Sequence, residues 1–160
     1  MQMSKWLIVS WVCSDMVVAS PRAVFGLPEA SRGLYAAAGG LARIVRICGL
    51  QVGSEIAMAG RKLSAEEALR FNVINKVSKT HQSVVEETVE MAKAISSLSP
   101  DAIIITRSGL REAWETGSVE RASQRTEDRF GKHLRDAENT RIGLEAFAQK
   151  KQPQWVPSKL

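Results

Sequence analysis

The nine residues FGLPEASRG, 25–33, carry the sequence signal that decides the fold, and they hold a single carboxylate, that of Glu29. Pro28 followed by an acid is typical of a helix start, because proline suits the first helical position and a carboxylate complements the helix dipole. A carboxylate beside Phe25 and Leu27 is also suited to moving a proton on a substrate. This stretch alone leaves both interpretations open.

Composition excludes several classes of function. A chain of 160 residues with 44% hydrophobic content forms one globular domain with a core. Its net charge of +5 comes from interleaved basic and acidic residues, and one Tyr and four Phe make a poor base-stacking surface, so no nucleic-acid partner is predicted. The two cysteines have no metal-ligand spacing, so no metal is predicted. The apolar segment 6–13 is shorter than the roughly 20 residues that span a bilayer, so no membrane span is predicted, and a secretory signal peptide there is the alternative.

The hydrophobic pattern predicts a helix-rich α/β chain with a few short strands. A β-branched run and a proline turn predict strand, turn and strand over 15–25, and a further strand is expected over 73–77. Ser64-Ala-Glu-Glu67 fits a capping box, in which the serine and glutamate side chains bond each other's backbone amides. Helices are predicted over 36–48, 53–59, from Ser64, and over 83–98, 101–115, 118–135 and 139–150.

Four segments follow one another along the chain: FGLPEASRGLYAAAGGLARIVRICG, AMAGRKLSAEEALRFNVINKV, ISSLSPDAI and GLEAFAQKKQPQW. In order and spacing, over about residues 15–155, they resemble the enoyl-CoA hydratase/isomerase (crotonase) family. The F-G-x-P-E element is the most specific of them, with Gly39-Gly40 ten residues after Glu29 and an arginine following. The resemblance implies a partial crotonase-like (ClpP/crotonase) fold with a C-terminal helical oligomerisation region, and a trimer or hexamer, homomeric or heteromeric.

The resemblance also implies a chemistry, in which the substrate is an acyl-CoA thioester and no cofactor is needed. Two backbone amides stabilise the negative charge that develops on the thioester oxygen, and acidic side chains move protons at the neighbouring carbons. Glu29 falls on the second family glutamate, with Phe25 and Gly26 beside the substrate. Phe147 and Lys150 fall on the region that contacts CoA, a solvated basic tail being the alternative. His81 and His133 have no partner at catalytic spacing and are expected to be solvated.

The family pattern breaks before Asp15. A G-G-G-x-E segment should supply the first glutamate, near Val9, and one oxyanion amide, yet residues 4–14 contain neither glycine nor an acid. We therefore expect the C-terminal half of a family member, with an N-terminal truncation or an altered start. The expected divisions are an atypical leader (1–14), the C-terminal part of the crotonase core (15–80), a helical C-terminal region (81–152) and an extended tail (153–160).

Two functions follow from this incomplete site. Hydration uses two carboxylates, whereas isomerisation of a 3-enoyl thioester needs only one shuttling base, which Glu29 can supply. The first expectation is an enoyl-CoA hydratase (a lyase) or isomerase, in peroxisomal β-oxidation or in specialised metabolite (toxin) biosynthesis. The alternative is a catalytically incomplete paralogue that acts as a non-catalytic subunit of a hetero-oligomer.

The chain ends in Ser158-Lys159-Leu160, which matches the tripeptide that the peroxisomal import receptor reads at a free C-terminus. Pro153 and Pro157 are expected to keep this tail extended and reachable. The tripeptide predicts a peroxisomal protein, with a plain polar tail as the alternative.

Overall fold

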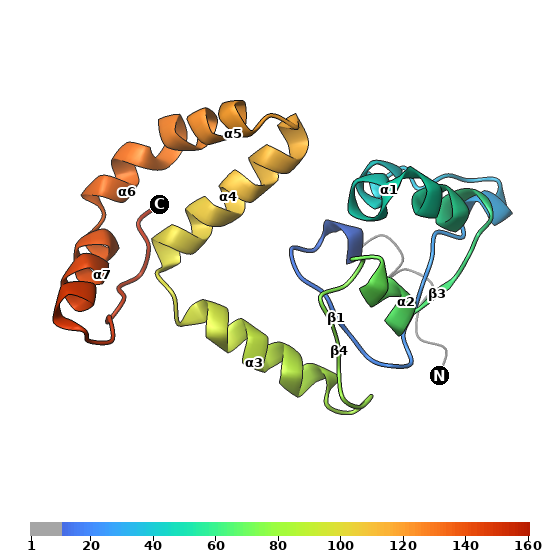
Figure 1. Cartoon of the computed structure of the whole chain (residues 1–160), viewed down its shortest axis with the longest axis horizontal. Helices are drawn as coiled ribbons and strands as arrows, with labels where there is room; N and C mark the ends of the chain where they lie inside the picture. Colours follow the sequence, from blue (N-terminus) through green and yellow to red (C-terminus); the bar gives the residue numbers. More distant parts are fainter. Residues whose placement is uncertain (1–10) are drawn as a thin grey trace. The chain divides into compact units, whose positions relative to one another are not determined.

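The computed structural model describes residues 11–160, and the chain divides into two compact units, Met1–Val89 and Glu90–Leu160. Helices dominate and every strand is short (Figure 1), which confirms the predicted helix-rich α/β class. The boundary between the units falls within helix α3 (Val84–Ser96). The other elements of the first unit are η1 (Trp11–Cys13), β1 (Val18–Ala19), β2 (Val24–Phe25), η2 (Glu29–Arg32), α1 (Gly40–Met58), β3 (Leu63–Ser64), α2 (Ala65–Arg70) and β4 (Lys76–Val77).

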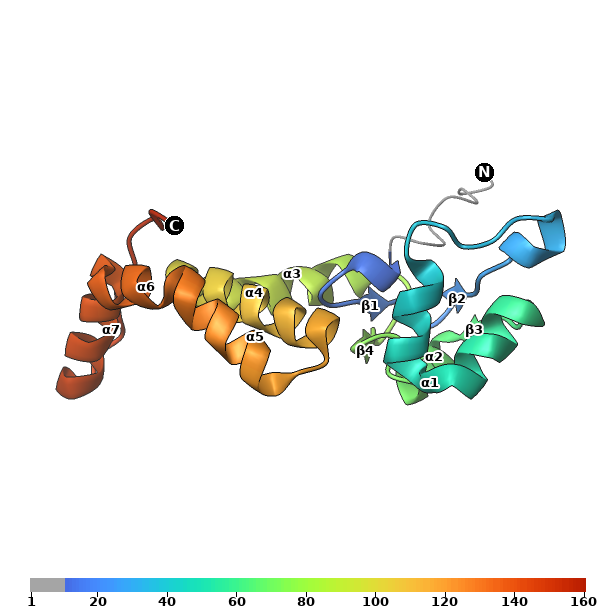
Figure 2. The same ribbon diagram turned by 90° about the horizontal axis from the view of Figure 1, so that it is seen from above.

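Within residues 11–160, four short strands pair in two separate ladders; Figure 2 labels each strand. β1 pairs in parallel with β4, where Val18 faces Lys76, and β2 pairs antiparallel with β3, where Phe25 faces Leu63. The strands at 18–19, 24–25 and 76–77 confirm the predicted strand regions. β3 was not predicted, because two residues are too few to show an alternating pattern.

Helix α1 bends at Gly49, which has φ 81° and ψ 166°. The predicted helix over 36–48 does stop at Gly49, but a second helical segment follows at once rather than at residue 53. A positive φ is readily available only to glycine, so this residue lets the helix change direction without a loop. The core of the first unit forms around α1, and its largest fully buried apolar side chains are those of Leu27, Ile44, Ile56 and Leu63.

The second unit consists of helices and the tail. Gly109 on α4 packs closely on α5, because a Cβ at this glycine would lie 3.3 Å from the Thr126 hydroxyl. The single helix predicted over 118–135 is continuous but contains one π turn, at Glu127–Gly131. The elements are α4 (Pro100–Thr116), α5 (Val119–Thr126), η3 (Glu127–Gly131), α6 (Lys132–Asp136) and α7 (Glu138–Gln149).

Candidate functional site

Glu29 opens the short 3-10 helix η2 and follows Pro28, the N-cap residue. The turn is closed by local bonds: the Ser31 hydroxyl donates to the Pro28 carbonyl (2.7 Å), and the Leu34 amide donates to the Glu29 carbonyl (3.0 Å). Gly33 ends the turn with φ 70°. The backbone of Glu29 is therefore fixed by its neighbours, and its side chain is not used to build the turn.

The Glu29 carboxylate lies between the core and the surface. Its residue is half-buried, and its Oε2 atom is buried without a hydrogen-bond partner among the residues that the structure describes. An unpaired buried oxygen costs about 1–3 kcal/mol, so such atoms call for an explanation in function. Here the oxygen is left to bond a group that residues 11–160 do not supply.

The chain segment that leads to Glu29 is apolar and largely buried. Phe25 and Leu27 are buried, and Phe25 pairs with Leu63 on β3. A Cβ at Gly26 would lie 3.4 Å from the Arg61 carbonyl, so glycine lets the backbone pass close to that segment. The structure thus brings Phe25 and Gly26 into the same strand-to-turn segment as Glu29.

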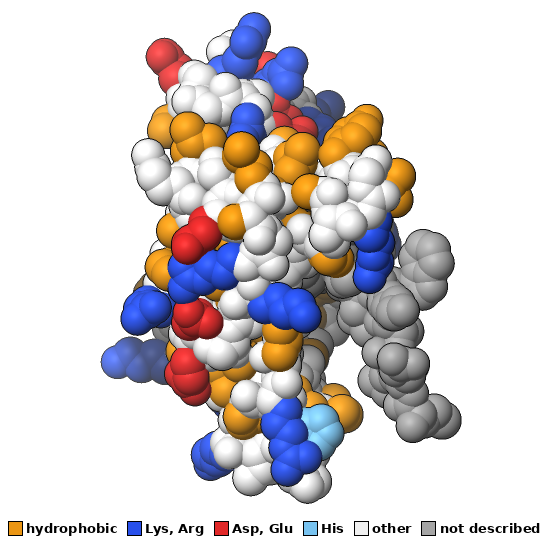
Figure 3. All heavy atoms as spheres, turned by 90° about the vertical axis from the view of Figure 1, so that its right-hand side faces the viewer, with side chains coloured by type: hydrophobic (Ala, Val, Ile, Leu, Met, Phe, Trp, Pro, Cys, Tyr) orange, Lys and Arg blue, Asp and Glu red, His pale blue; other side chains and the backbone are white. Residues whose placement is uncertain are grey.

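Apolar side chains are exposed in the segment that follows Glu29. Leu34 and Tyr35 are 65% and 71% exposed, and hydrophobic side chains gather in the upper part of the face drawn in Figure 3. Such side chains suit contact with an acyl chain or with further polypeptide.

Arg43 contacts the backbone at the start of α1, a contact that the sequence did not indicate. Its Nη1 donates to the Ala38 carbonyl (3.4 Å), while its Nε is buried without a partner among the described residues. A Cβ at Gly39 would lie 2.1 Å from Nη1, and Gly39 has φ 80°. The guanidinium therefore lies over a glycine, and this contact fixes the start of α1. The only sequence feature that could have pointed to this contact is the position of Arg43 shortly after Gly39-Gly40.

An ion-pair network fixes the connection between β4 and α3. Glu87 is 7% exposed, and its carboxylate lies 2.6 Å from Lys76 Nζ and accepts bonds from the Ser83 hydroxyl (2.7 Å) and the Lys79 amide (2.8 Å). Lys76 first, and then these two donors, lower the pKa of Glu87 to about 2. The Glu87 carboxylate is therefore ionised at neutral pH, and it joins the end of β4 to the start of α3.

The remaining predicted residues lie elsewhere. Phe147 is 85% exposed on α7, and Lys150 ends that helix with φ 53°; both belong to the second unit. His81 is exposed, as predicted, and its Nδ1 lies 2.7 Å from the hydroxyl of Ser20, a contact 61 residues away in the chain that the sequence did not indicate. That hydroxyl also accepts a bond from the Arg22 amide (3.2 Å), so the pair belongs to a surface turn.

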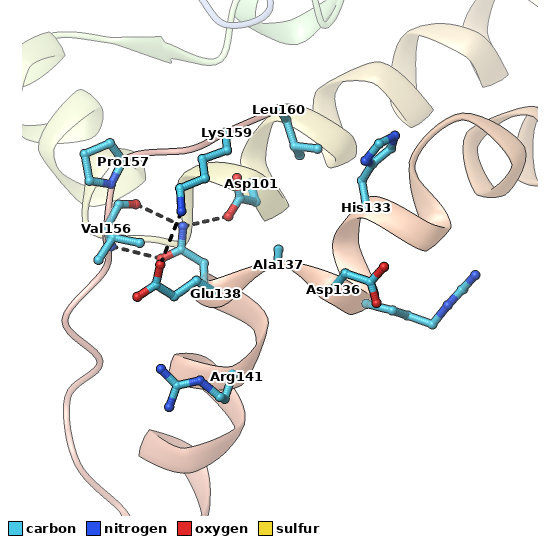
Figure 4. Close-up of a pocket in the computed structure, with 12 residues that line it drawn as sticks. Asp101, His133, Asp136, Ala137, Glu138, Arg141, Val156, Pro157, Lys159 and Leu160 are labelled. Carbon is cyan, nitrogen blue, oxygen red and sulfur yellow. Dashed lines mark hydrogen bonds and ion pairs between the residues drawn. The ribbon is translucent and has the colours of Figure 1, made fainter.

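The C-terminal tail is bonded to helices of the second unit, while its last two residues, Lys159 and Leu160, are exposed. Asn139 forms two 2.9 Å bonds with the backbone of Val156 (Figure 4). The Ser158 hydroxyl donates to Asp101. Asp101, Asn139 and the tail line a hollow of about 630 Å³.

One predicted position lies in the part of the chain that the structure does not describe, and two further searches cover residues 11–160. The position near Val9, where the first family glutamate would fall, lies outside the described residues. Within residues 11–160, no three His, Cys, Asp or Glu side chains gather as a metal site. No helix in this range is both long and apolar enough to cross a bilayer.

Comparison with known proteins decides the family. The sequence model of the enoyl-CoA hydratase/isomerase family matches residues 9–158. The chain belongs to the enoyl-CoA hydratase/isomerase family. This family member is 45% identical over 146 residues to the mevalonyl-coenzyme A hydratase sidH of Aspergillus fumigatus, covering 91% of the chain and 54% of the relative. It is 31% identical over 150 residues to the carnitinyl-CoA dehydratase of Salmonella typhimurium, covering 90% of the chain and 56% of that relative.

Solved structures agree with this assignment. An enoyl-CoA hydratase/isomerase from Mycobacterium paratuberculosis superposes with a TM-score of 0.83 at 27% identity, covering 92% of this chain and 58% of that one. An enoyl-CoA hydratase from Mycobacterium marinum gives 0.83 at 26% identity, covering 92% and 57%. The chain of this family member spans about half the length of the relatives it matches.

Proposed function

We propose that this crotonase-family chain takes part in enolate chemistry on an acyl-CoA thioester, with Glu29 moving the proton at C2. The observation that carries the proposal is the unpaired, buried Oε2 of Glu29 in the F-G-x-P-E element of a confirmed family member. A base in an apolar wall can take the C2 proton as the electron pair moves to the thioester oxygen. In isomerisation the same carboxylate returns that proton to C4.

The substrate class is proposed from the relatives. At 45% identity, the mevalonyl-coenzyme A hydratase of A. fumigatus favours a 3-hydroxyacyl or 2-enoyl thioester of the mevalonyl type. Dehydration of such a thioester breaks the C2–H and C3–O bonds and releases water. This substrate favours specialised metabolite (toxin) biosynthesis over general β-oxidation. Phe25 and Gly26 would line the substrate side of the site, and Phe147 and Lys150 would contact CoA.

Turnover by the purified chain tests the proposal. We expect the purified chain to convert a 3-enoyl-CoA to the 2-enoyl form, which needs one shuttling base, with mevalonyl-CoA and crotonyl-CoA as comparison substrates. Glu29→Gln should lower the rate at least about 100-fold, because it removes the proton acceptor. Glu66→Gln is the matched control, since Glu66 is exposed on α2. Equal rates for wild type and Glu29→Gln would contradict the proposal.

A non-catalytic subunit is the second candidate function. It is favoured by the match to only about half of each relative and by side chains such as Val119, 82% exposed. In this case the chain would join a longer family member in a trimer or hexamer. Co-expression and sedimentation separate the candidates: a stable mixed oligomer, with no turnover by the chain alone, supports the second.

We also propose that Ser158-Lys159-Leu160 directs the protein to the peroxisome through the import receptor. A fluorescent protein fused to the N-terminus should give punctate fluorescence, and deletion of Leu160 should disperse it. Diffuse fluorescence before the deletion would contradict this assignment.

A further inference from the structure

We propose that Asp101 and Asn139 form a clasp that holds the C-terminal tail and competes with the import receptor for Ser158-Lys159-Leu160. The inference rests on the proposed peroxisomal signal and adds its regulation. The clasp is the pair Asp101 and Asn139 together with the bonds they make to residues 156–160.

The two clasp residues are polar and almost fully buried. Asp101 is 3% exposed in the first turn of α4, and Asn139 is 2% exposed in the first turn of α7. The Asn139 Nδ2 donates to Asp101 Oδ2 at 2.6 Å, so the two helix starts are joined by one side-chain bond. Buried polar groups persist when their bonds are satisfied, and here the tail completes the set.

The tail is bound through its backbone first. Asn139 Oδ1 accepts from the Val156 amide and Nδ2 donates to the Val156 carbonyl, both at 2.9 Å. Just before this point, the Trp155 Nε1 donates to the Ser97 carbonyl at 2.9 Å. The two bonds to Asn139 use only the backbone of residue 156, so they hold the path of the tail whatever side chain stands there.

The residues of the signal tripeptide also form bonds within the chain, and Figure 4 shows Lys159 and Leu160 beside Asp101 and Glu138. The Ser158 hydroxyl donates to Asp101 Oδ1 and accepts from the Leu160 amide at 3.1 Å. Lys159 Nζ lies 3.7 Å from Glu138 Oε2, an exposed pair that contributes little. Because the Ser158 hydroxyl and the Leu160 amide are both bonded within the chain, a receptor that grips this tripeptide must first break these contacts.

The consequence is a reduced apparent affinity. For a receptor that binds only the released tail, the apparent affinity equals the affinity for the open tail multiplied by the fraction of chains in which the tail is open. Three or four hydrogen bonds with buried partners are sufficient for a reduction of at least about tenfold. A partner or an assembly step that disturbs the starts of α4 and α7 would release the tail and raise receptor binding.

The experiment compares the full chain with a free peptide of residues 151–160, using the soluble peptide-binding domain of a peroxisomal import receptor as the probe. We expect the full chain to bind at least about tenfold more weakly than the peptide. Asn139→Ala should bring the dissociation constant of the chain to within about twofold of the peptide. Glu145→Gln is the control, because it breaks the exposed Arg141–Glu145 pair on the same helix and touches no tail residue.

Each outcome has a definite meaning. Equal binding by chain and peptide overturns the clasp while leaving the signal intact. Weaker binding by the chain that Asn139→Ala does not relieve also overturns it. If neither chain nor peptide binds, the peroxisomal assignment fails and the inference falls with it.

A measurement without variants covers the case in which Asn139→Ala does not fold. Carboxypeptidase should release Leu160 from the wild-type chain at least about tenfold more slowly than from the peptide, because the enzyme needs the open tail. Equal release rates would overturn the clasp.

Discussion

Glu29 has a buried carboxylate oxygen to which no described residue of the chain donates a hydrogen bond. The cost of about 1–3 kcal/mol is recovered when a proton or a ligand donor reaches that oxygen. The turn around Glu29 is held by backbone and hydroxyl groups, so the carboxylate is left available for chemistry. The proposed chemistry therefore rests on the Glu29 side chain and on Gly33, which ends the turn that holds it.

Gly39→Ala should destabilise the first unit more than Gly60→Ala does. Both glycines have positive φ, 80° and 66°, but only at Gly39 would the new Cβ meet Arg43, at 2.1 Å, whereas the space at Gly60 is open. We expect about 1 kcal/mol for Gly60→Ala from backbone strain. For Gly39→Ala, about 1–3 kcal/mol more is expected from displacing the guanidinium. Urea unfolding of the two variants measures the difference, and equal losses would show that the Arg43 contact carries no weight.

Glu87→Gln should remove an acid-sensitive part of the stability. The folded pKa of about 2 lies below the ordinary value of 4.5, so the contribution is complete above pH about 4.5. It is lost as the pH falls from about 4.5 towards 2, because the unfolded chain takes up the proton first. Melting temperatures of wild type and variant should therefore differ at pH 7 and converge near pH 2. Glu86→Gln, at an exposed neighbour, is the control; a constant difference across this range would contradict the assignment.

Single residues differ in how far sequence can locate them. Glu29 was predictable because its neighbours in the chain form the motif. Asn139 was not, because its partners Asp101 and Val156 lie 38 and 17 residues away in the chain. The same holds for His81 and Ser20, which are 61 residues apart. Contacts of this range depend on the packed fold and leave no local pattern.

Helices were predicted well where local signals mark their ends. Ser99 caps α4 and Gly117 ends it with φ 65°, as the pattern over 101–115 indicated. The π turn at Glu127–Gly131 was not predicted. In this turn the Glu127 carboxylate lies close to Gly131, where a Cβ would be 2.1 Å from it, and the hydrophobic pattern does not reveal such a contact. Strand pairing was beyond the sequence for a similar reason, because each ladder joins segments far apart in the chain.

Ser64→Ala should destabilise helix α2 by about 1 kcal/mol. The capping box is present as predicted: the Ser64 hydroxyl accepts from the Glu67 amide (3.2 Å), and the Glu67 carboxylate accepts from the Ser64 amide (2.9 Å). The same Glu67 binds Arg61 at 2.6 Å, and these donors lower its pKa, with the Ser64 amide contributing most. Urea unfolding measures the loss. Ser64→Asp, which keeps an acceptor, should recover most of the stability, and a loss as large as that of alanine would contradict the cap.

At the scale of the molecule, two compact units divide the functional features. The first contains Glu29 and the buried apolar residues that precede it in the chain, and the second contains the helices α4 to α7 with the tail clasp. The chain spans about half the length of each of these relatives. Proton transfer at C2 can be observed separately from the complete reaction, which makes it the more direct test.

Hydrogen exchange at C2 of a saturated thioester such as butyryl-CoA, in deuterated water, tests the central claim most directly. In this exchange a base removes the C2 proton to give the enolate, the proton on the base is replaced by deuterium from the solvent, and a deuteron is returned to C2, with no hydration or double-bond shift. We predict exchange above the uncatalysed rate for the wild-type chain and a loss of at least about 100-fold in Glu29→Gln, with Glu66→Gln unchanged. Exchange that is equally fast in wild type and Glu29→Gln would contradict the assignment of Glu29 as the acid/base.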